Sequence, residues 1–211
     1  GEPYARVLST VTHGAAGPDT TNVGGPSIIA AALAAQLLGA DSRIAYYGAL
    51  GRDAYAGMIM ERLKKTPLDL THYVTLEGAT PSTDVLSDPR HDGGRGERTF
   101  INSIGAAWNY GPGQLPDSFF DADIVRLGAT ALVPRLHDAM EGLLARAKAA
   151  GRVTMVTTVY DFRNAKARPD EPWPLGLRGQ TGDCLAKTDL LAVDAEEGLK
   201  ISGQATLADA C

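Results

Sequence analysis

The sequence predicts an α/β domain in which helices cover a mostly parallel sheet. Three observations support this class. Helical and β-rich stretches alternate along most of the chain, glycine turns follow several strands, and two short strands interrupt the alternation near the middle. The 211 residues, 44% hydrophobic and 21% charged, suit one folded domain of ordinary to large size.

The first half of the chain shows the alternation most clearly. A helix is expected over residues 26–38, because Pro26 suits the first helical position and Gly39 suits the end. A β-rich run over 43–50 and a second amphipathic helix over 54–65 follow. This order is typical of a parallel sheet with crossover helices.

The middle of the chain predicts a hairpin. Residues 82–87 and 97–103 are two short strands, and the loop 88–96 between them is rich in glycine and charge. A two-stranded piece is not stable alone in water, so it must lean on the main body or on another subunit. We interpret it as a flap and expect a homodimer through residues 82–103.

Alternation resumes in the second half. Between 161 and 177 the three prolines predict an irregular loop. The other expected elements are strands at 123–127, 152–159 and 189–193, helices at 136–150 and 194–202, and the start of a further helix at 205–211.

Composition excludes several functions. The formal charge of −5 and the scattered basic residues argue against a nucleic-acid partner. No apolar run reaches the roughly 20 residues that cross a bilayer, so no membrane partner is expected. The only cysteines, Cys184 and Cys211, have no metal-ligand spacing and predict a reducing, cytoplasmic setting.

Two glycine turns are the first candidate ligand contacts. Gly24 and Gly25 precede Pro26 and Ser27 at a helix start, where backbone N–H groups can face a hydroxyl or an anion. The alternative is a plain loop-to-helix turn. Asp53 follows a glycine turn at a strand end, where open α/β sheets bind ligands, and its alternative role is to cap the next helix.

Three further candidates lie beyond later strands. Arg163 can pair with a phosphate or carboxylate, or can form a salt bridge that organises its loop, close to Asp161. Asp194 and Glu197 begin a helix, where the macrodipole alone favours carboxylates. They can also hold a hydrated Mg²⁺, which prefers one or two carboxylates with water and phosphate.

The four histidines lack ligand spacing, and none is predicted to act as a catalytic base. We expect His137 to be a surface residue of the 136–150 helix. Neither a Walker A loop nor a G-x-G-x-x-G fingerprint is present.

Taken in order, these motifs resemble the PfkB (ribokinase-like) family of sugar and nucleoside kinases over almost the whole chain. The segments that carry the resemblance are Gly24-Gly25 with its helix, Gly51-Arg52-Asp53 through Gly57, Thr80-Pro81-Ser82, Gly96-Glu97-Arg98-Thr99-Phe100, Gly105-Ala106, and Asp194-Ala195-Glu196-Glu197 followed by Gly203.

The resemblance implies a three-layer α/β/α fold with a small β lid. Residues 1–211 would form a single, incomplete ribokinase-like domain, with the lid contributed by about 4–14 and 80–104. It also implies ATP-dependent phosphorylation of a sugar-like hydroxyl, with Mg²⁺ bridging phosphates. An unrelated Rossmann-like domain is a weaker alternative.

The resemblance also assigns residues. The substrate would lie under the lid near Gly24, Gly25 and Asp53, with Arg98 and Arg163 as further substrate or phosphate contacts. Asp194 and Glu197 would act on magnesium through water. The family's Gly-Ala-Gly-Asp turn, which supplies the catalytic base and anion hole, belongs downstream of Cys211, so no catalytic residue is assigned within the chain.

The chain departs from the family pattern at three positions. Arg6 stands where an Asp usually binds sugar hydroxyls, Ile29 where an Asn is usual, and Asp194 where another Asn is usual. An arginine suits carboxylate or phosphate better than a neutral hydroxyl. These changes imply either an anionic substrate, with Arg6 among its contacts, or a non-catalytic binding or regulatory protein.

Overall fold

In this computed structural model the chain is described over residues 2–14, 17–174 and 181–210. Its strands form two parallel sheets and one antiparallel hairpin within those ranges. The strands are β1 (Gly48–Leu50), β2 (Tyr73–Thr75), β3 (Ser82–Asp88), β4 (Glu97–Ser103), β5 (Ile124–Gly128), β6 (Val153–Thr157) and β7 (Leu190–Ala192).

The helices fill the connections between these strands. The α-helices are α1 (Glu2–Val11), α2 (Pro26–Leu38), α3 (Ala54–Leu63), α4 (His91–Gly94), α5 (Pro134–Asp138), α6 (Met140–Ala149), α7 (Phe162–Ala167), α8 (Thr181–Ala186), α9 (Ala195–Ser202) and α10 (Leu207–Ala210). Short 3-10 turns are η1 (Gly39–Asp41), η2 (Gly105–Asn109), η3 (Pro112–Gln114), η4 (Asp117–Phe120) and η5 (Thr130–Leu132). The expected α/β alternation is therefore confirmed.

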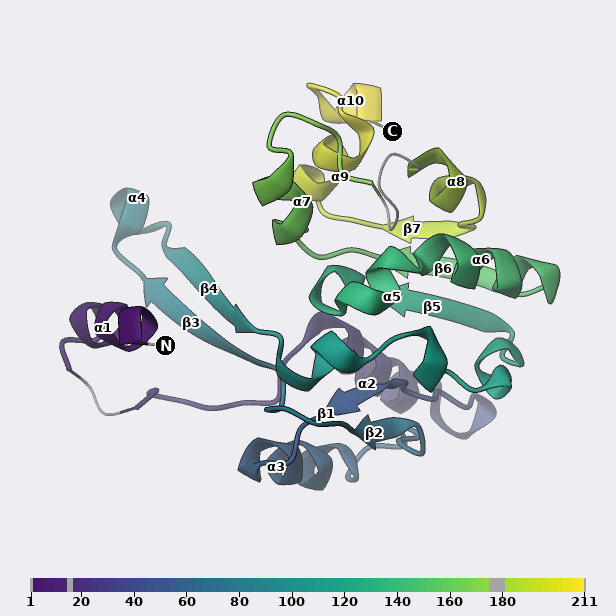
Figure 1. The fold of residues 1–211 in the computed structure, drawn as a ribbon, viewed down its shortest axis with the longest axis horizontal. Coiled ribbons are helices and arrows are strands. Elements are labelled where there is room, and N and C mark those ends of the chain that lie inside the picture. The colour runs from purple at the N-terminus through teal and green to yellow at the C-terminus, as the bar shows by residue number, and fades with distance from the viewer. Residues whose placement is uncertain (1, 15–16, 175–180, 211) are drawn as a thin grey trace.

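The parallel strands all end on the same side of the molecule. β1 pairs with β2, and β6 pairs with both β5 and β7, all in parallel register. Figure 1 shows the arrowheads of these strands pointing toward the side where the β3–β4 hairpin projects. The hairpin thus stands beside the carboxyl edge of the sheets, which is where open α/β folds bind ligands.

Two clusters of buried apolar side chains support this edge. The larger one packs β5 and β6 against α5 and α6 and includes Val125, Leu127, Leu144 and Val156. The smaller one packs α2 against α3 and the 68–73 segment. Helix α2 carries apolar side chains on both its buried and its exposed faces. Ile28 and Ala32 are buried, whereas Leu33 and Leu37 are exposed.

Local signals set the helix limits. Pro26 is at the start of α2 and Gly39, with a φ of 62°, caps its end. The side chain of Asp53 caps α3, and that of Asp194 caps α9. Gly203, with a φ of 68°, ends α9 in the left-handed conformation that glycine adopts without steric cost.

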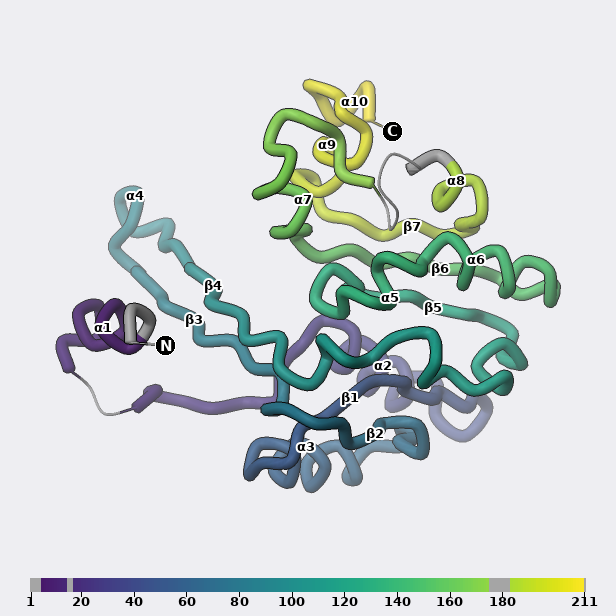
Figure 2. The backbone as a smooth tube through the Cα atoms, in the orientation of Figure 1, coloured from purple at the N-terminus to yellow at the C-terminus, as the bar shows by residue number. Residues whose placement is uncertain are grey.

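The structure differs from the sequence-based expectation in two segments. Residues 4–14, expected to contribute to the β lid, belong mostly to helix α1, whose Val7 and Val11 lie four residues apart at helical spacing. Figure 2 traces the chain from α1 back past the hairpin to α2. The loop expected over 161–177 contains helix α7, and its residues 175–177 lie outside the described part.

Within the described residues, no helix has the length and apolar character needed to cross a bilayer.

Candidate functional site

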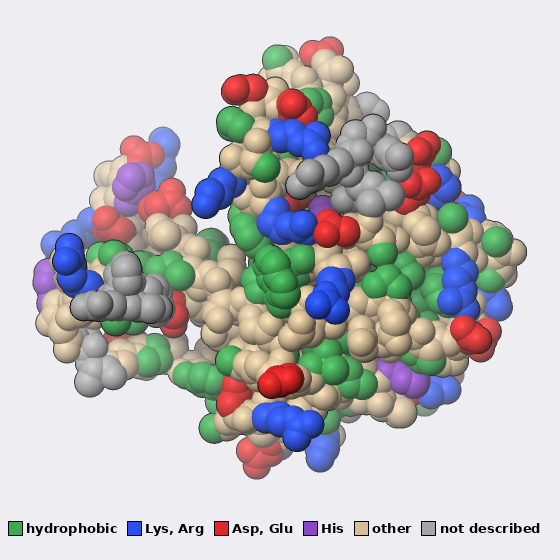
Figure 3. Space-filling model, viewed as in Figure 1, with side chains coloured by type: hydrophobic (Ala, Val, Ile, Leu, Met, Phe, Trp, Pro, Cys, Tyr) green, Lys and Arg blue, Asp and Glu red, His purple; other side chains and the backbone are tan. Residues whose placement is uncertain are grey.

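The carboxyl edge brings together the segments that follow each parallel strand. These segments are 51–53 after β1, 78–80 after β2, 128–130 after β5, 158–161 after β6, and Asp194 after β7. The first turn of α2 reaches the same edge, because an added Cβ at Gly128 would lie 2.5 Å from Ser27 Oγ. Figure 3 shows the surface hollowed between the hairpin end and the main body.

Asp53 ties helix α3 to the root of the hairpin. Its Oδ1 accepts hydrogen bonds from Ala56 N (3.0 Å) and Thr80 Oγ1 (2.6 Å), and its Oδ2 accepts one from Thr80 N (2.7 Å). The bonds from Thr80 hold the pKa of the Asp53 carboxyl below its ordinary value. Asp53 therefore performs the capping role that the sequence left open, and its carboxylate remains exposed at the edge.

The turn after β1 has no room for a side chain at position 51. An added Cβ there would lie 2.3 Å from Gly78 O and 2.3 Å from Thr80 N, which are backbone atoms. Gly51 N in turn donates to the buried Thr80 hydroxyl at 3.1 Å. The two strand ends of the first sheet are thus packed backbone against backbone.

The glycine pair before α2 is exposed at the same edge. Gly25 has a φ of 101° and precedes the first helical residue, so its conformation requires glycine. Gly24 has no atom within 4 Å of an added Cβ, which means that open space lies beside it. The turn can therefore admit a ligand, and it also serves as an ordinary helix start.

Arg126 and Ser27 lie where α2 meets β5. Arg126 Nη2 donates to Thr157 Oγ1 at 2.8 Å, and Nη1 donates to Ser27 O at 3.4 Å. The Ser27 hydroxyl oxygen is buried and has no hydrogen-bond partner. Burial lowers the pKa of the Arg126 guanidinium and outweighs an opposing effect from Tyr46.

A buried hydrogen-bond chain crosses between the β5 and β6 ends. Thr130 Oγ1 lies 3.0 Å from His137 Nδ1, and His137 Nε2 lies 3.1 Å from Asp161 Oδ2. Burial alone would raise the pKa of Asp161, but the hydrogen bonds from His137 and Asn164 outweigh it and the pKa is lowered. An ionised Asp161 can only accept, so His137 Nε2 is the donor in their hydrogen bond.

The expected surface position of His137 is therefore wrong. Its side chain is only 5% exposed, because the short helix α5 turns it inward between Thr130 and Asp161. A pocket beside this chain has a volume of about 20 Å³, close to the size of one water molecule. It is too small for a sugar.

Arg163 is engaged within the protein. Its guanidinium forms a two-point ion pair with Asp138, at 3.0 and 3.2 Å. Of the two roles left open by the sequence, the loop-organising salt bridge is the one present in this structure. Its role in substrate binding stays a prediction.

Asp194 and Glu197 lie together at the start of α9. Asp194 Oδ1 accepts from Glu197 N at 2.8 Å, and Glu197 Oε2 accepts from the Thr158 hydroxyl. Among the described residues, none donates a hydrogen bond to the second oxygen of either carboxylate. The described residues contain no cluster of three or more metal-ligating side chains. Carboxylate oxygens are the donor type that a hydrated Mg²⁺ prefers, and the magnesium role of Asp194 and Glu197 stays a prediction.

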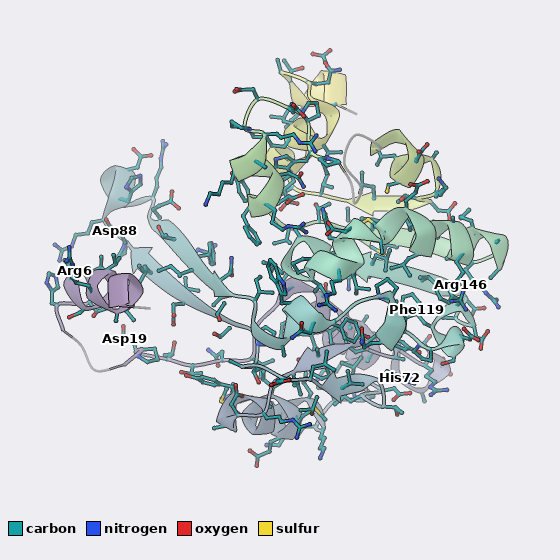
Figure 4. All side chains as sticks on the ribbon, in the orientation of Figure 1. Arg6, Asp19, His72, Asp88, Phe119 and Arg146 are labelled. Carbon is teal, nitrogen blue, oxygen red and sulfur yellow. The ribbon has the colours of Figure 1, made fainter. Side chains whose placement is uncertain are left out.

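The two remaining predicted contacts lie away from the glycine pair. Arg6 is on α1, which in the view of Figure 4 lies on the side of the hairpin, away from the main body. Arg98 is exposed on β4, with its guanidinium 5.7 Å from the ring centre of Phe100. The structure does not bring Arg6 to Gly24 and Gly25, because residues 4–14 form a helix and not a strand of the sheet.

Sequence reasoning missed Arg126 and underestimated His137. Arg126 carried a visible signal, since it interrupts the apolar run Ile124-Val125-Arg126-Leu127 in a strand expected to be buried. His137 carried none, because its partner Asp161 is 24 residues away in the sequence.

A parallel α/β architecture with a hairpin beside the carboxyl edge of its strands defines a ribokinase-like α/β fold. The chain belongs to the pfkB family of carbohydrate kinases, which it matches over residues 5–211.

Solved structures support the fold. Ribokinase from Arabidopsis thaliana, complexed with ribose and ATP, is 21% identical with a TM-score of 0.64, covering 89% of this chain and 54% of its own. A putative ribokinase II from E. coli is 19% identical with a TM-score of 0.66, covering 92% and 62%. Adenosine kinase from Sinorhizobium meliloti is 19% identical with a TM-score of 0.65, covering 99% and 58%.

The chain thus spans between about half and two thirds of the length of these structures. A comparison with curated proteins found no match.

Proposed function

We propose that this protein takes part in ATP-dependent phosphorylation of a hydroxyl group on a sugar-like substrate. The observation that carries the proposal is the match to the carbohydrate kinase family over residues 5–211, together with a hairpin beside the carboxyl edge. The Arabidopsis relative is complexed with ribose and ATP, which supports the same class of substrate and cofactor here.

In this proposal the chain positions the acceptor. The substrate lies between the β3–β4 hairpin and the carboxyl edge, close to Gly24, Gly25 and Asp53. The open space at Gly24 allows close approach to the backbone. Arg98, exposed on β4, would add a further substrate or phosphate contact from the hairpin. Phosphoryl transfer depends mainly on positioning and charge neutralisation, so contacts of this kind contribute directly to the rate.

Magnesium, when bound, would neutralise charge on the phosphates of ATP. Asp194 and Glu197 would hold it through water, using the oxygens left free by the cap and by Thr158. The burial of Glu197, which is 8% exposed, keeps its carboxylate in one orientation. We assign the catalytic base to no residue of this chain.

The test is a coupled ATPase assay on the full-length protein, with a panel of sugars, sugar acids and nucleosides. We expect turnover with at least one of them, and a large loss of turnover on removal of Mg²⁺. Matched variants are Glu197→Gln, which should weaken the magnesium dependence, and Glu171→Gln, which removes an exposed carboxylate paired with Arg168. No turnover with any substrate, from folded protein, would contradict the kinase function.

A non-catalytic binding or regulatory protein is the second candidate. It is supported by the internal use of two predicted substrate contacts, since Asp53 binds Thr80 and Arg163 binds Asp138. This candidate predicts that calorimetry detects sugar binding to the full-length protein without phosphorylated product.

We also propose a homodimer through the hairpin, in a cytoplasmic setting that the scarcity of cysteines supports. Val85 and Phe100, cross-strand neighbours on one face, are 50% and 54% exposed. Burying such side chains against a second copy removes apolar area from water. Light scattering should give a dimer at micromolar concentration, which Phe100→Glu disrupts and Tyr55→Glu, on α3, does not. A wild-type monomer would contradict this arrangement.

A further inference from the structure

Arg126 lies on β5, on the face of the sheet where it contacts helix α2. Along β5, Val125 and Leu127 are 2% and 4% exposed and face the larger core. The alternation of a strand therefore directs Arg126 to the opposite face, where it contacts Ser27 of α2. None of the described residues forms an ion pair with it. A partly buried charge is unfavourable unless it is paired.

In the described parts of the chain, the groups around Arg126 include hydrogen-bond donors, and no carboxylate forms an ion pair with it. The Ser27 hydroxyl is buried without a partner, although buried polar groups are nearly always hydrogen-bonded. Thr157 already receives a bond from Arg126. The N-terminus of the 13-residue helix α2 has a partial positive charge, which repels a neighbouring cation unless an anion lies between them.

Gly128 keeps these groups close to one another. An added Cβ at this position would lie 2.5 Å from Ser27 Oγ, 2.9 Å from Thr157 Oγ1 and 3.2 Å from Arg126 Nη2. Three polar groups thus converge on a strand end where a side chain is absent. They occupy the carboxyl edge beside the glycine pair that precedes α2.

We propose that Arg126 and Ser27 form a subsite for an anionic group of the substrate. The phosphate acceptor would then be a sugar derivative that already carries a carboxylate or a phosphate. A guanidinium binds both groups through two parallel hydrogen bonds, whereas a neutral hydroxyl uses only one. This proposal rests on the proposed kinase function for the identity of the acceptor, but the subsite itself does not need turnover.

Calorimetry on the full-length protein without ATP tests the subsite. The probes are D-gluconate for a carboxylate, D-glucose 6-phosphate for a phosphate, and D-glucose as the neutral reference. We expect one anionic probe to bind at least about tenfold more tightly than D-glucose, corresponding to one charge-assisted contact. Which anionic probe binds distinguishes a sugar acid from a sugar phosphate.

Variants identify the residues responsible. Arg126→Gln should lower the affinity for the anionic probe about 10- to 100-fold and leave the affinity for D-glucose unchanged. Ser27→Ala should lower the affinity for the anionic probe a few-fold. This second variant tests the subsite if Arg126→Gln does not fold. Arg62→Gln is the matched control, because Arg62 is exposed on α3 and donates to Asn22.

The outcomes separate the subsite from the kinase function. Equal affinity of wild-type protein for all three probes, or unchanged anion affinity in both variants, overturns the subsite. Turnover of neutral sugars alone overturns the subsite and leaves the kinase function. Anion binding that depends on Arg126, without turnover of any sugar, supports the subsite and contradicts the kinase function.

Discussion

Replacing Gly51 with alanine should destabilise the protein strongly, because the new methyl group has no space. The added Cβ would lie 2.3 Å from Gly78 O and 2.4 Å from the carbonyl carbon of Ala79, whereas ordinary contact begins at 3.4 Å. The 78–80 backbone must therefore retreat by about 1 Å. Two hydrogen bonds that cross this contact weaken with it, from Gly51 N to Thr80 Oγ1 and from Arg52 N to Gly78 O.

The magnitude follows from these two effects. Overpacking of this kind costs about 1–3 kcal/mol, and each weakened hydrogen bond adds about 0.5–1.5 kcal/mol. Together they give a loss of about 2–6 kcal/mol. This loss lowers the Tm of a chain of this size by roughly 4–24 °C. Gly57→Ala is the matched control, since Gly57 lies within α3 with no atom within 4 Å of an added Cβ. It should raise stability by about 0.5–1 kcal/mol.

Differential scanning calorimetry measures the Tm of wild type, Gly51→Ala and Gly57→Ala. If Gly51→Ala melts within about 1 °C of wild type, the close approach of the two strand ends does not exist. The same result would remove the reason for a glycine at this turn and weaken the argument that Asp53 is held against the hairpin root.

Three other perturbations test interactions of the structure, two at the carboxyl edge and one at the opposite ends of β6 and β7. Asp53→Ala should cost about 0.5–2 kcal/mol in urea denaturation from loss of the α3 cap alone. His137→Ala should cost about 1–3 kcal/mol, because it leaves a buried carboxylate and hydroxyl without their partner, whereas exposed His91→Ala should change stability by less than about 0.5 kcal/mol. The pKa of Asp189 is lowered to about 2, chiefly by Lys148, so its stabilisation is complete above about pH 4 and declines as the pH falls toward 2. Asp189→Asn should therefore flatten the dependence of Tm on pH in that window, and an unchanged profile contradicts the ion pair.

The fold was predictable where the signals are local. Helix α2 begins and ends at the predicted residues, because Pro26 and Gly39 act on their own backbone. Strand β4 also coincides with its prediction, since a glycine-rich loop leaves the chain few alternatives to a hairpin. Strand β2, of only three residues, was missed because its pairing with β1 comes from tertiary contact.

The candidate site was predictable only in part for the same reason. The cap formed by Asp53 is local, and the sequence anticipated it. The bonds from Thr80 to that carboxylate span 27 residues, and those around Arg126 span 31 and 99. No short-range pattern records which strand ends become neighbours, so residues joined by the sheet topology become visible only in the folded chain.

The folded structure also changes which arginine is expected to bind an anionic substrate. The sequence pointed to Arg6 because it occupies a position that is usually acidic, yet Arg6 lies on helix α1, away from the main body in the view of Figure 4. Asp53 and Arg163, at the carboxyl edge, already have partners within the protein. Arg126 differs because its contacts are a hydroxyl and a carbonyl, which leave its charge uncompensated. Since an unpaired charge that is partly buried is unfavourable, Arg126 is the stronger candidate for recognising an anionic substrate.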